Sequence, residues 1–310
     1  FKKEFKIVNE NKIKYYFDFN LLISDIKEKK ICLDLIVLAT PSGLHAEQTK
    51  LSANVGINVC TEKPMATNWK DGLDMNKVCK KKGVKLFVVK QNRYNKTLLL
   101  LKKQLLKNRF GKLSIININV FWQRPQNYYD QDNWRGTIKF DGGALMNQAS
   151  HYVDLLHWLV GPVESISAST ATLGRDIEVE DSAALQIRFK NGAIGTMAVT
   201  MLTYPKNLEG SITILGEKGT VKIGGVAVNK IEHWDFKDKN EQDESDVYDA
   251  NYETDNVYGN GHIPYYENMI KSLNNEEEAI CDGHEGLKTL ELICAAYKSS
   301  STNKVIKLPL

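Results

Sequence analysis

Residues 33–40, LDLIVLAT, form a continuous, mostly apolar stretch that leads directly into the turn sequence PSGLH. Eight residues are too few for a core helix, so this stretch predicts a buried β-strand. Strand and helix patterns alternate around it, which is typical of parallel βαβ units in a doubly wound sheet. We expect two further strands at residues 57–64 and 84–92, and helices at residues 19–30, 45–56 and 67–83.

The chain beyond residue 94 carries a different pattern. From residue 163 to residue 236, strand patterns follow one another and are separated by hairpin signals such as Lys190-Asn191-Gly192. This run predicts a large open antiparallel sheet. We therefore expect an α/β fold of two domains, a Rossmann-like doubly wound parallel sheet in residues 1–93 and an α+β domain in residues 94–310. The remaining expectations are helices at 95–111, 142–162, 264–275 and 283–301, strands at 112–122 and 305–310, and an acidic surface loop at 237–255.

The composition argues against several classes of protein. A net charge of +3 over 310 residues gives no argument for a nucleic-acid partner. The five cysteines are odd in number and form no CxxC pair, which argues against a disulfide framework and a zinc site. The longest apolar run is far shorter than the roughly 20 residues of a membrane span. We therefore expect a cytoplasmic protein with no metal, nucleic-acid or membrane partner.

Three segments fall at the carboxyl ends of the predicted parallel strands: TPSGLH, TEKP and KQNRYN. In open α/β sheets, ligands bind beyond these ends. Lys63 ends an apolar strand there, and a lysine is readily shifted in pKa by partial burial. The alternatives left open are an ordinary strand-to-helix turn for TPSGLH and a surface lysine beside a helix start for TEKP.

The stretch GGALMNQASHYVDLL, residues 142–156, places polar residues at the front of an otherwise apolar helix. At 3.6 residues per turn, Asn147, His151 and Asp154 lie on one face. Histidine is well suited to exchange protons near neutral pH, so this face is a candidate wall of an active site. The alternative is a buried histidine that bonds only to Asp154 or to a carbonyl.

Taken together, these segments resemble the Gfo/Idh/MocA family of sugar oxidoreductases. The resemblance rests on ATPSGLHAEQ (39–48), TEKPMA (61–66) and GGALMNQASHYVDLL (142–156), and it covers nearly the whole chain. Four further segments resemble one branch of the family, the dehydrogenases of a UDP-linked aminouronic acid in bacterial surface-polysaccharide synthesis. These segments are residues 90–95, 121–137, 174–181 and 201–229.

The resemblance implies NAD-dependent oxidation of the carbon-3 hydroxyl of UDP-N-acetylglucosaminuronate (UDP-GlcNAcA) in lipopolysaccharide (O-antigen) sugar biosynthesis. It implies that residues 1–93 are the remainder of a dinucleotide-binding Rossmann domain. It also implies that residues 94–310 bind the substrate and assemble the chain into a homo-oligomer, a dimer or tetramer. Two alternatives stay open: a dehydrogenase of another sugar or cyclitol, and a truncated, non-catalytic binding or scaffold relative.

The resemblance also assigns roles to single residues. Lys63, Asn147 and His151 are expected to be catalytic, with His151 as the general base. Arginines in the branch-specific segments, Arg93, Arg124 and Arg135, suit phosphate and carboxylate groups. The expected cofactor-binding residues are Thr40, Pro41, Ser42, His45, Glu62, Lys63, Pro64 and Gln91. The expected substrate-binding residues are Arg93, Asn95, Trp134, Arg135, Asn147, Gln148, His151 and His262.

The chain departs from the family pattern at two places. Much of the family has aspartate where this chain has Asn147, although the resembled branch has asparagine there too. No glycine-rich phosphate loop precedes Tyr16, so the first βαβ unit of the Rossmann domain is expected to be missing. A chain without that loop is expected to bind NAD poorly, and the segment that would separate NAD from NADP is absent.

Overall fold

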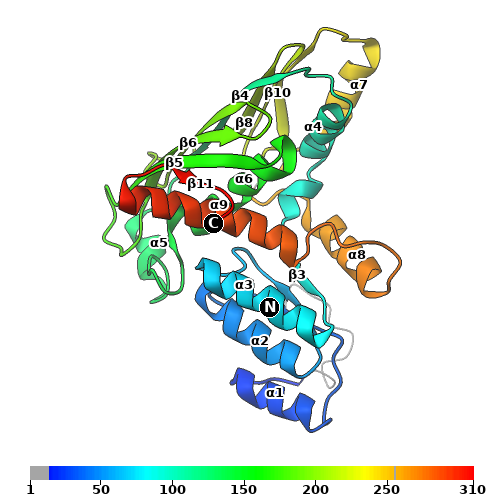
Figure 1. The fold of residues 1–310 in the computed structure, drawn as a ribbon, viewed down its shortest axis with the longest axis vertical. Helices are drawn as coiled ribbons and strands as arrows, with labels where there is room; N and C mark the ends of the chain where they lie inside the picture. Colours follow the sequence, from blue (N-terminus) through cyan, green and yellow to red (C-terminus); the bar gives the residue numbers. More distant parts are fainter. Residues whose placement is uncertain (1–13, 255) are drawn as a thin grey trace.

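The computed structural model describes residues 14–254 and 256–310. Its first unit is a parallel sheet in the order β1-β2-β3, formed by Leu35–Leu38, Asn58–Thr61 and Leu86–Val88. Figure 1 shows this unit at the lower end of the molecule, with its helices beside the sheet. The predicted parallel α/β unit is therefore confirmed. The expectation of a missing phosphate loop rests on residues before Tyr16, most of which lie outside the described residues. The helices of this unit are α1 (Phe19–Lys27), α2 (His45–Asn54) and α3 (Trp69–Lys82).

Local chemistry fixes where α3 begins and ends. The side chain of Asn68 accepts a hydrogen bond from the backbone N–H of Asp71 at 2.9 Å, which satisfies a donor at the helix start. Gly83 follows the helix in the left-handed conformation, with φ of 67°. Asparagine and glycine are residue types that commonly cap the two ends of a helix.

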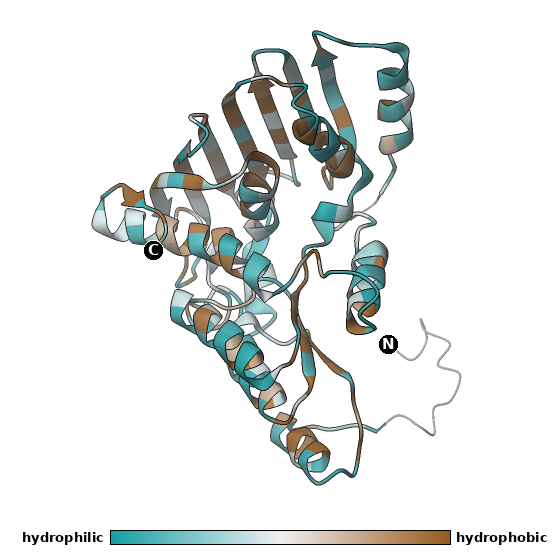
Figure 2. Ribbon diagram, turned by 45° about the vertical axis from the view of Figure 1, so that its right-hand side comes forward, coloured by the Kyte–Doolittle hydropathy of each residue, from teal (hydrophilic) through white to brown (hydrophobic). Residues whose placement is uncertain are grey.

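The second unit is built on an eight-stranded sheet (Figure 1). Along its strands apolar and polar residues alternate, which Figure 2 shows as brown and teal bands, so one face meets the core. The antiparallel prediction is wrong for one pair, because β4 and β7 run parallel. In spatial order the strands are β10 (Lys230–Phe236), β9 (Gly219–Gly224), β8 (Glu209–Gly216), β4 (Leu113–Phe121), β7 (Ile194–Thr200), β6 (Ser182–Phe189), β5 (Val163–Ala171) and β11 (Ile306–Lys307).

The acidic segment that we predicted as a surface loop contains a helix, α7 (Glu241–Ala250). A capping box starts it, in which Asn240 and Asp243 each bond the other's backbone N–H. Asp243 also pairs with Arg109, at 2.6 Å. The prediction failed because the polarity of the segment hid this start signal. The other helices of the second unit are α4 (Lys96–Leu106), α5 (Gln126–Asp130), α6 (Ser150–Leu155), α8 (His262–Leu273) and α9 (Gly283–Thr302).

The helix predicted at residues 142–162 is not one regular α-helix. Wider π-helical turns at Ala144–Gln148 and Leu156–Val160 flank the short α6. Glu180 supplies partners to the first turn, because its backbone carbonyl accepts from Ala144 at 3.1 Å and its carboxyl accepts from Leu145 at 2.8 Å. π-Turns of this kind occur often at functional sites.

Helix α9 joins the two units. It contacts α3 and β3 of the first unit and α6 and β5 of the second. Figure 1 shows it crossing the middle of the molecule between the two sheets. One continuous cluster of buried apolar side chains therefore runs through both units. In the described part of the chain, no helix is both long and apolar enough to span a membrane.

The turn after β1 approaches the second unit closely at Gly43. Its N–H donates to the carbonyl of Phe140 at 3.1 Å. A Cβ atom at this position would lie 2.1 Å from the carbonyl oxygen of Lys139 and 2.9 Å from the Cα of Phe140. Only glycine fits here, because both opposing atoms belong to the backbone.

We predict that Gly43→Ala lowers the free energy of unfolding by about 1–3 kcal/mol, because the added methyl group forces the two backbone segments apart. Urea unfolding followed by circular dichroism measures the change. Asn54→Ala, at an exposed position of the adjacent helix α2, is the matched control and should stay within about 0.5 kcal/mol of wild type. Equal stability of Gly43→Ala and wild type would contradict this close approach.

Candidate active site

The segments after β1, β2 and β3 meet at one edge of the parallel sheet. His45 holds two of them together, since Nε2 lies 2.9 Å from the carbonyl of Thr40 and Nδ1 lies 2.9 Å from that of Pro64. The ring is 1 % exposed, and this burial lowers its pKa. We expected His45 to contact a cofactor. In this structure both ring nitrogens face backbone carbonyls and the protonated one donates to its neighbour, so His45 positions the loops, and its contact with a cofactor stays a prediction.

Lys63 reaches from this edge to the segment before α6. Its Nζ donates to the backbone carbonyl of Asn147 at 2.8 Å and to Oδ1 of the same residue at 3.1 Å. Nδ2 of Asn147 in turn donates to Asp141. The pKa of Lys63 is lowered to about 8, mainly by burial and also by the charge of Arg124, against the opposing charges of Glu62 and Asp141. Lys63 is therefore a cation at neutral pH that loses its proton easily.

His151 lies beside Lys63, and both line one cavity. Its Nε2 is 3.2 Å from Nε2 of Gln91, the residue that follows β3 by three positions. An amide N–H₂ can only donate, so Nε2 of His151 accepts and the ring proton lies on Nδ1. Burial, together with the charge of Lys63, holds the pKa of His151 well below its usual range. The imidazole is therefore neutral at pH 7 and able to accept a proton.

His262 approaches the same site from the start of α8. It is half-buried, burial lowers its pKa, and its charge also affects His151. The preceding Gly261 packs so tightly that a Cβ atom would lie 1.9 Å from the carbonyl oxygen of Gln91. This contact fixes the loop that carries His262 against the end of β3.

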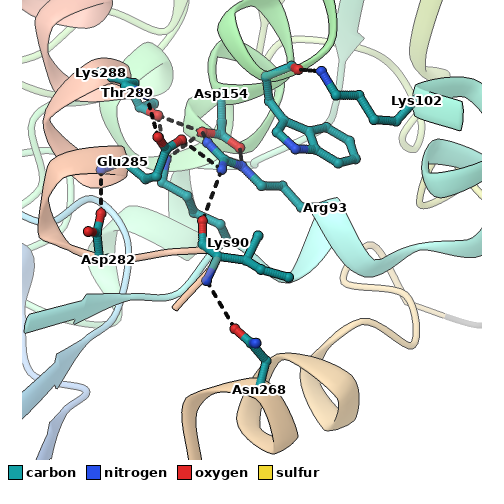
Figure 3. A network of polar contacts seen from close by, with 11 residues as sticks. Lys90, Arg93, Lys102, Asp154, Asn268, Asp282, Glu285, Lys288 and Thr289 are labelled. Atoms are coloured by element: carbon teal, nitrogen blue, oxygen red, sulfur yellow. Dashed lines mark hydrogen bonds and ion pairs between the residues drawn. The ribbon is translucent and has the colours of Figure 1, made fainter. Parts of the chain in front are cut away.

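A buried ion network lies directly behind His151, and Figure 3 shows it. Asp154 accepts from Lys90 at 2.5 Å and from Nε and Nη2 of Arg93 at 2.7 and 2.8 Å. Thr289 of α9 donates to the same carboxylate at 2.7 Å. Burial opposes ionisation of Asp154, but the two cations outweigh it and hold its pKa well below the usual range.

This network corrects two expectations. We expected Arg93 to bind substrate, yet its side chain is 2 % exposed and is also paired with Glu285 at 2.8 Å. Its guanidinium is thus committed to the protein and positions the site. The alternative of a hydrogen bond between His151 and Asp154 is also wrong, because Asp154 bonds to Lys90, Arg93 and Thr289 instead.

The other residues expected to contact the substrate differ in burial and in their hydrogen-bond partners. Asn95 and Gln148 are buried, and each has one side-chain atom without a protein partner, Oδ1 and Nε2. Arg135 pairs with Asp132 at 2.9 Å and lies 4.7 Å from the ring centroid of Trp134. At the cofactor edge, Thr40 donates to Gln48 at 2.6 Å and Ser42 is buried.

Sequence reasoning missed three groups at this site. Asp141 stands behind Asn147, and its position directly before Gly142-Gly143 could have drawn attention to it. Lys90 lies in a segment, residues 90–95, that we noted as a strand end and as similar to one branch of the family, but we expected no role for it. Glu180 contacts the segment before α6 and has its pKa raised by burial to about 7; it lies in residues 174–181, also similar to that branch, but no role was expected for it. The described residues hold no cluster of three acidic, histidine or cysteine side chains suited to a metal ion.

Comparisons with known proteins give consistent matches. A model described as an oxidoreductase family NAD-binding Rossmann fold matches residues 2–90. A model described as an oxidoreductase family C-terminal alpha/beta domain matches residues 102–308, and both carry the name Gfo/Idh/MocA.

Two solved structures are similar over most of the chain. The WlbA dehydrogenase from Bordetella pertussis, in complex with NADH and UDP-GlcNAcA, is 55 % identical, with a TM-score of 0.89 over 93 % of this chain and 82 % of that one. The WlbA dehydrogenase from Chromobacterium violaceum, with the same two ligands, is 54 % identical, with a TM-score of 0.87 over 93 % and 81 %. A more distant relative, scyllo-inositol 2-dehydrogenase (NADP(+)) of Bacillus subtilis, is 22 % identical over 288 residues, 89 % of this chain and 79 % of the relative.

We predict that Asp154→Asn lowers the free energy of unfolding by roughly 3–5 kcal/mol, because it leaves Lys90 and Arg93 buried without their carboxylate. Urea unfolding at pH 7 measures the loss. The control is Asp132→Asn, which removes the exposed partner of Arg135 and should cost about 1 kcal/mol or less. Similar losses for the two variants would show that the network contributes no more than a surface ion pair.

Proposed function

Because the chain belongs to the Gfo/Idh/MocA family of oxidoreductases, we propose that it oxidises the carbon-3 hydroxyl of UDP-GlcNAcA. The chain is an NAD-dependent sugar dehydrogenase, and the proposal concerns its substrate and the atom oxidised. The observation that carries it is the identity of 55 % over 93 % of the chain with a dehydrogenase crystallised with NADH and UDP-GlcNAcA. The convergence of Lys63, Asn147 and His151 on one site supports it.

The residues at the carboxyl edge of the parallel sheet fit a nicotinamide cofactor. Oε1 of Gln91 is buried beside His151 and has no hydrogen-bond partner in the described part of the chain. A carboxamide N–H₂ group is the kind of donor that would satisfy it. When bound, NAD takes up the hydride released from the sugar carbon. The residues that we propose to hold it are Thr40, Pro41, Ser42, Glu62, Lys63, Pro64 and Gln91.

The remaining chemistry is assigned to residues of this chain. We assign to His151 the removal of the hydroxyl proton, because its imidazole is neutral, and the substrate hydroxyl takes the place of the Gln91 amide at Nε2. The Lys63 ammonium donates to the same substrate oxygen and stabilises the negative charge that develops there. Asn147 holds Lys63 in place with a neutral group, so that the cation is not locked in a direct ion pair. Gln148 and His262 are proposed to contact the sugar.

We extend the proposal to the organisation of the protein. The boundary between the cofactor and substrate domains lies at residues 93 and 94. The chain assembles into dimers or tetramers through the outer face of the large sheet. That face exposes Ile115 and Ile194 on neighbouring strands, and exposed apolar side chains side by side suggest a covering surface. The reaction is placed in the cytoplasm, in the synthesis of lipopolysaccharide sugars.

The substrate assignment is tested by turnover of the full chain with NAD, followed by the absorbance of the reduced nicotinamide. We expect a signal with UDP-GlcNAcA and none with UDP-N-acetylglucosamine, which lacks the carboxylate. His151→Ala should lower the rate about a hundredfold or more, because the general base is removed. An equal rate with both sugars, or full activity of His151→Ala, would show that the substrate or the base is wrongly assigned.

The pKa of Lys63 predicts how the rate depends on pH. The protonated ammonium is the active form, so kcat/KM for UDP-GlcNAcA should fall as the pH rises through about 8. The Asp141 carboxylate raises the pKa of Lys63, so Asp141→Asn should move this fall to lower pH. Asp249→Asn, on the exposed side of α7, is the control and should leave the profile unchanged. If the fall in rate at high pH occurs at the same pH in Asp141→Asn as in wild type, it does not report the titration of Lys63.

A further inference from the structure

Arg124 is held rigidly at the end of β4. Its backbone N–H donates to the carbonyl of Met201 at 2.9 Å, and its own carbonyl accepts from Nε of Arg175 at 2.7 Å. The neighbouring Gln123 forms an isolated bridge with Leu202. The backbone of Arg124 is therefore fixed by contacts to two other segments.

The side chain of Arg124 is fixed as well. The carbon of its guanidinium lies 5.3 Å from the ring centroid of Trp122 and 5.5 Å from that of Tyr128. Trp122 is buried and meets the edge of Tyr152 at 5.9 Å, and Tyr152 is the residue next to His151. Such stacking leaves the hydrogen-bonding edges of a guanidinium free while it restricts the rotamer. Arg124 is thus positioned from the same helix that carries His151.

This guanidinium is not neutralised. In residues 14–254 and 256–310 no carboxylate lies within 4.0 Å of Arg124, whereas Arg93 and Arg135 both have acidic partners. Only Nη1 of Arg124 has protein acceptors, the carbonyl of Gln123 at 2.7 Å and Oδ1 of Asn207 at 3.4 Å. Nε and Nη2 donate to no described protein group. These two N–H groups form the edge that binds a carboxylate or phosphate through two parallel hydrogen bonds.

The open edge belongs to the electrostatic environment of the active site. The charge of Arg124 lowers the pKa of Lys63, whose ammonium is proposed to bind the reacting oxygen. The carboxylates of Glu62 and Asp141 both act on Lys63, whereas among the described residues no carboxylate pairs with Arg124. An anionic ligand would supply the missing counter-charge.

We propose that Arg124 binds an anionic oxygen group of the substrate, a carboxylate or a phosphate, through its free Nε–Nη2 edge. If that group is the sugar carboxylate, Arg124 makes the enzyme prefer acidic nucleotide sugars, in place of Arg93, which is buried in an ion network. The inference rests on the proposed function, because it assigns one contact of the proposed substrate.

The test is calorimetric titration of the full chain with UDP-GlcNAcA, UDP-N-acetylglucosamine and UDP. Arg124→Met should bind UDP-GlcNAcA roughly tenfold to a hundredfold more weakly than wild type, because a charge-assisted hydrogen-bonded pair is lost. Arg124→Lys keeps the charge but lacks the paired N–H groups, and it should lose at least several-fold. The control is Lys206→Met, which removes one exposed positive charge from the nearby turn. Thermal midpoints and NAD binding establish that each variant is folded.

The three ligands separate the two sources of negative charge. A loss by Arg124→Met that is confined to UDP-GlcNAcA identifies the sugar carboxylate, and an equal loss for all three identifies the diphosphate. The inference is overturned if folded Arg124→Met or Arg124→Lys binds every ligand as wild type does, or if Lys206→Met loses as much. If wild type fails to bind UDP-GlcNAcA, the proposed function is wrong. The titration with UDP then tests the proposed anion site at Arg124 by itself. The site is supported if wild type binds UDP and Arg124→Met does not. It is overturned if wild type does not bind UDP, or if Arg124→Met binds UDP as well as wild type does.

Discussion

The buried carboxylate of Asp154 is the constraint on which the active-site geometry depends. It bonds to Lys90 and Arg93 from the end of β3 and to Thr289 from α9, while its own helix carries His151. Three elements from distant parts of the chain are thus held at one point (Figure 3). A charge pair so deeply buried contributes little net stability, because desolvation cancels much of the attraction. The effect of the ion network is to fix the imidazole of His151 relative to the carboxyl edge of the parallel sheet, where β3 ends.

The relay from Lys63 through Asn147 to Asp141 controls charge in a different way. A direct lysine–carboxylate pair would hold the proton firmly on the lysine, because a nearby opposite charge favours the charged form. Here a neutral amide stands between the two charges, and burial brings the pKa of Lys63 to about 8. The same cavity wall keeps His151 neutral. One site therefore holds a ready proton acceptor and a cation without either neutralising the other.

Much of the fold could be predicted from the sequence, because the strands and the helix ends depend on local sequence pattern. The apolar stretch ending at Thr40 and the caps Asn68 and Gly83 act within a few residues of themselves. Helix periodicity placed Asn147 and His151 on one face, and the resemblance to the family grouped them with Lys63. The role of Arg93 could not be predicted, since its partner Glu285 lies 192 residues further along the chain. The π-turn before α6 was missed for a similar reason, because the N–H groups of Ala144 and Leu145 donate to Glu180.

The parallel pairing of β4 with β7 has a consequence for how the protein is made. Ile115 of β4 pairs with Ile194 on one side and Leu215 on the other, so both neighbours of this central strand are synthesised long after it. Contacts between residues so far apart in the chain form slowly. Until residues 194–216 leave the ribosome, β4 has two unpaired edges, and unpaired edges recruit strands from other chains. During this interval the nascent β4 is therefore a strand that other chains can pair with, although both of its edges are covered in the finished molecule.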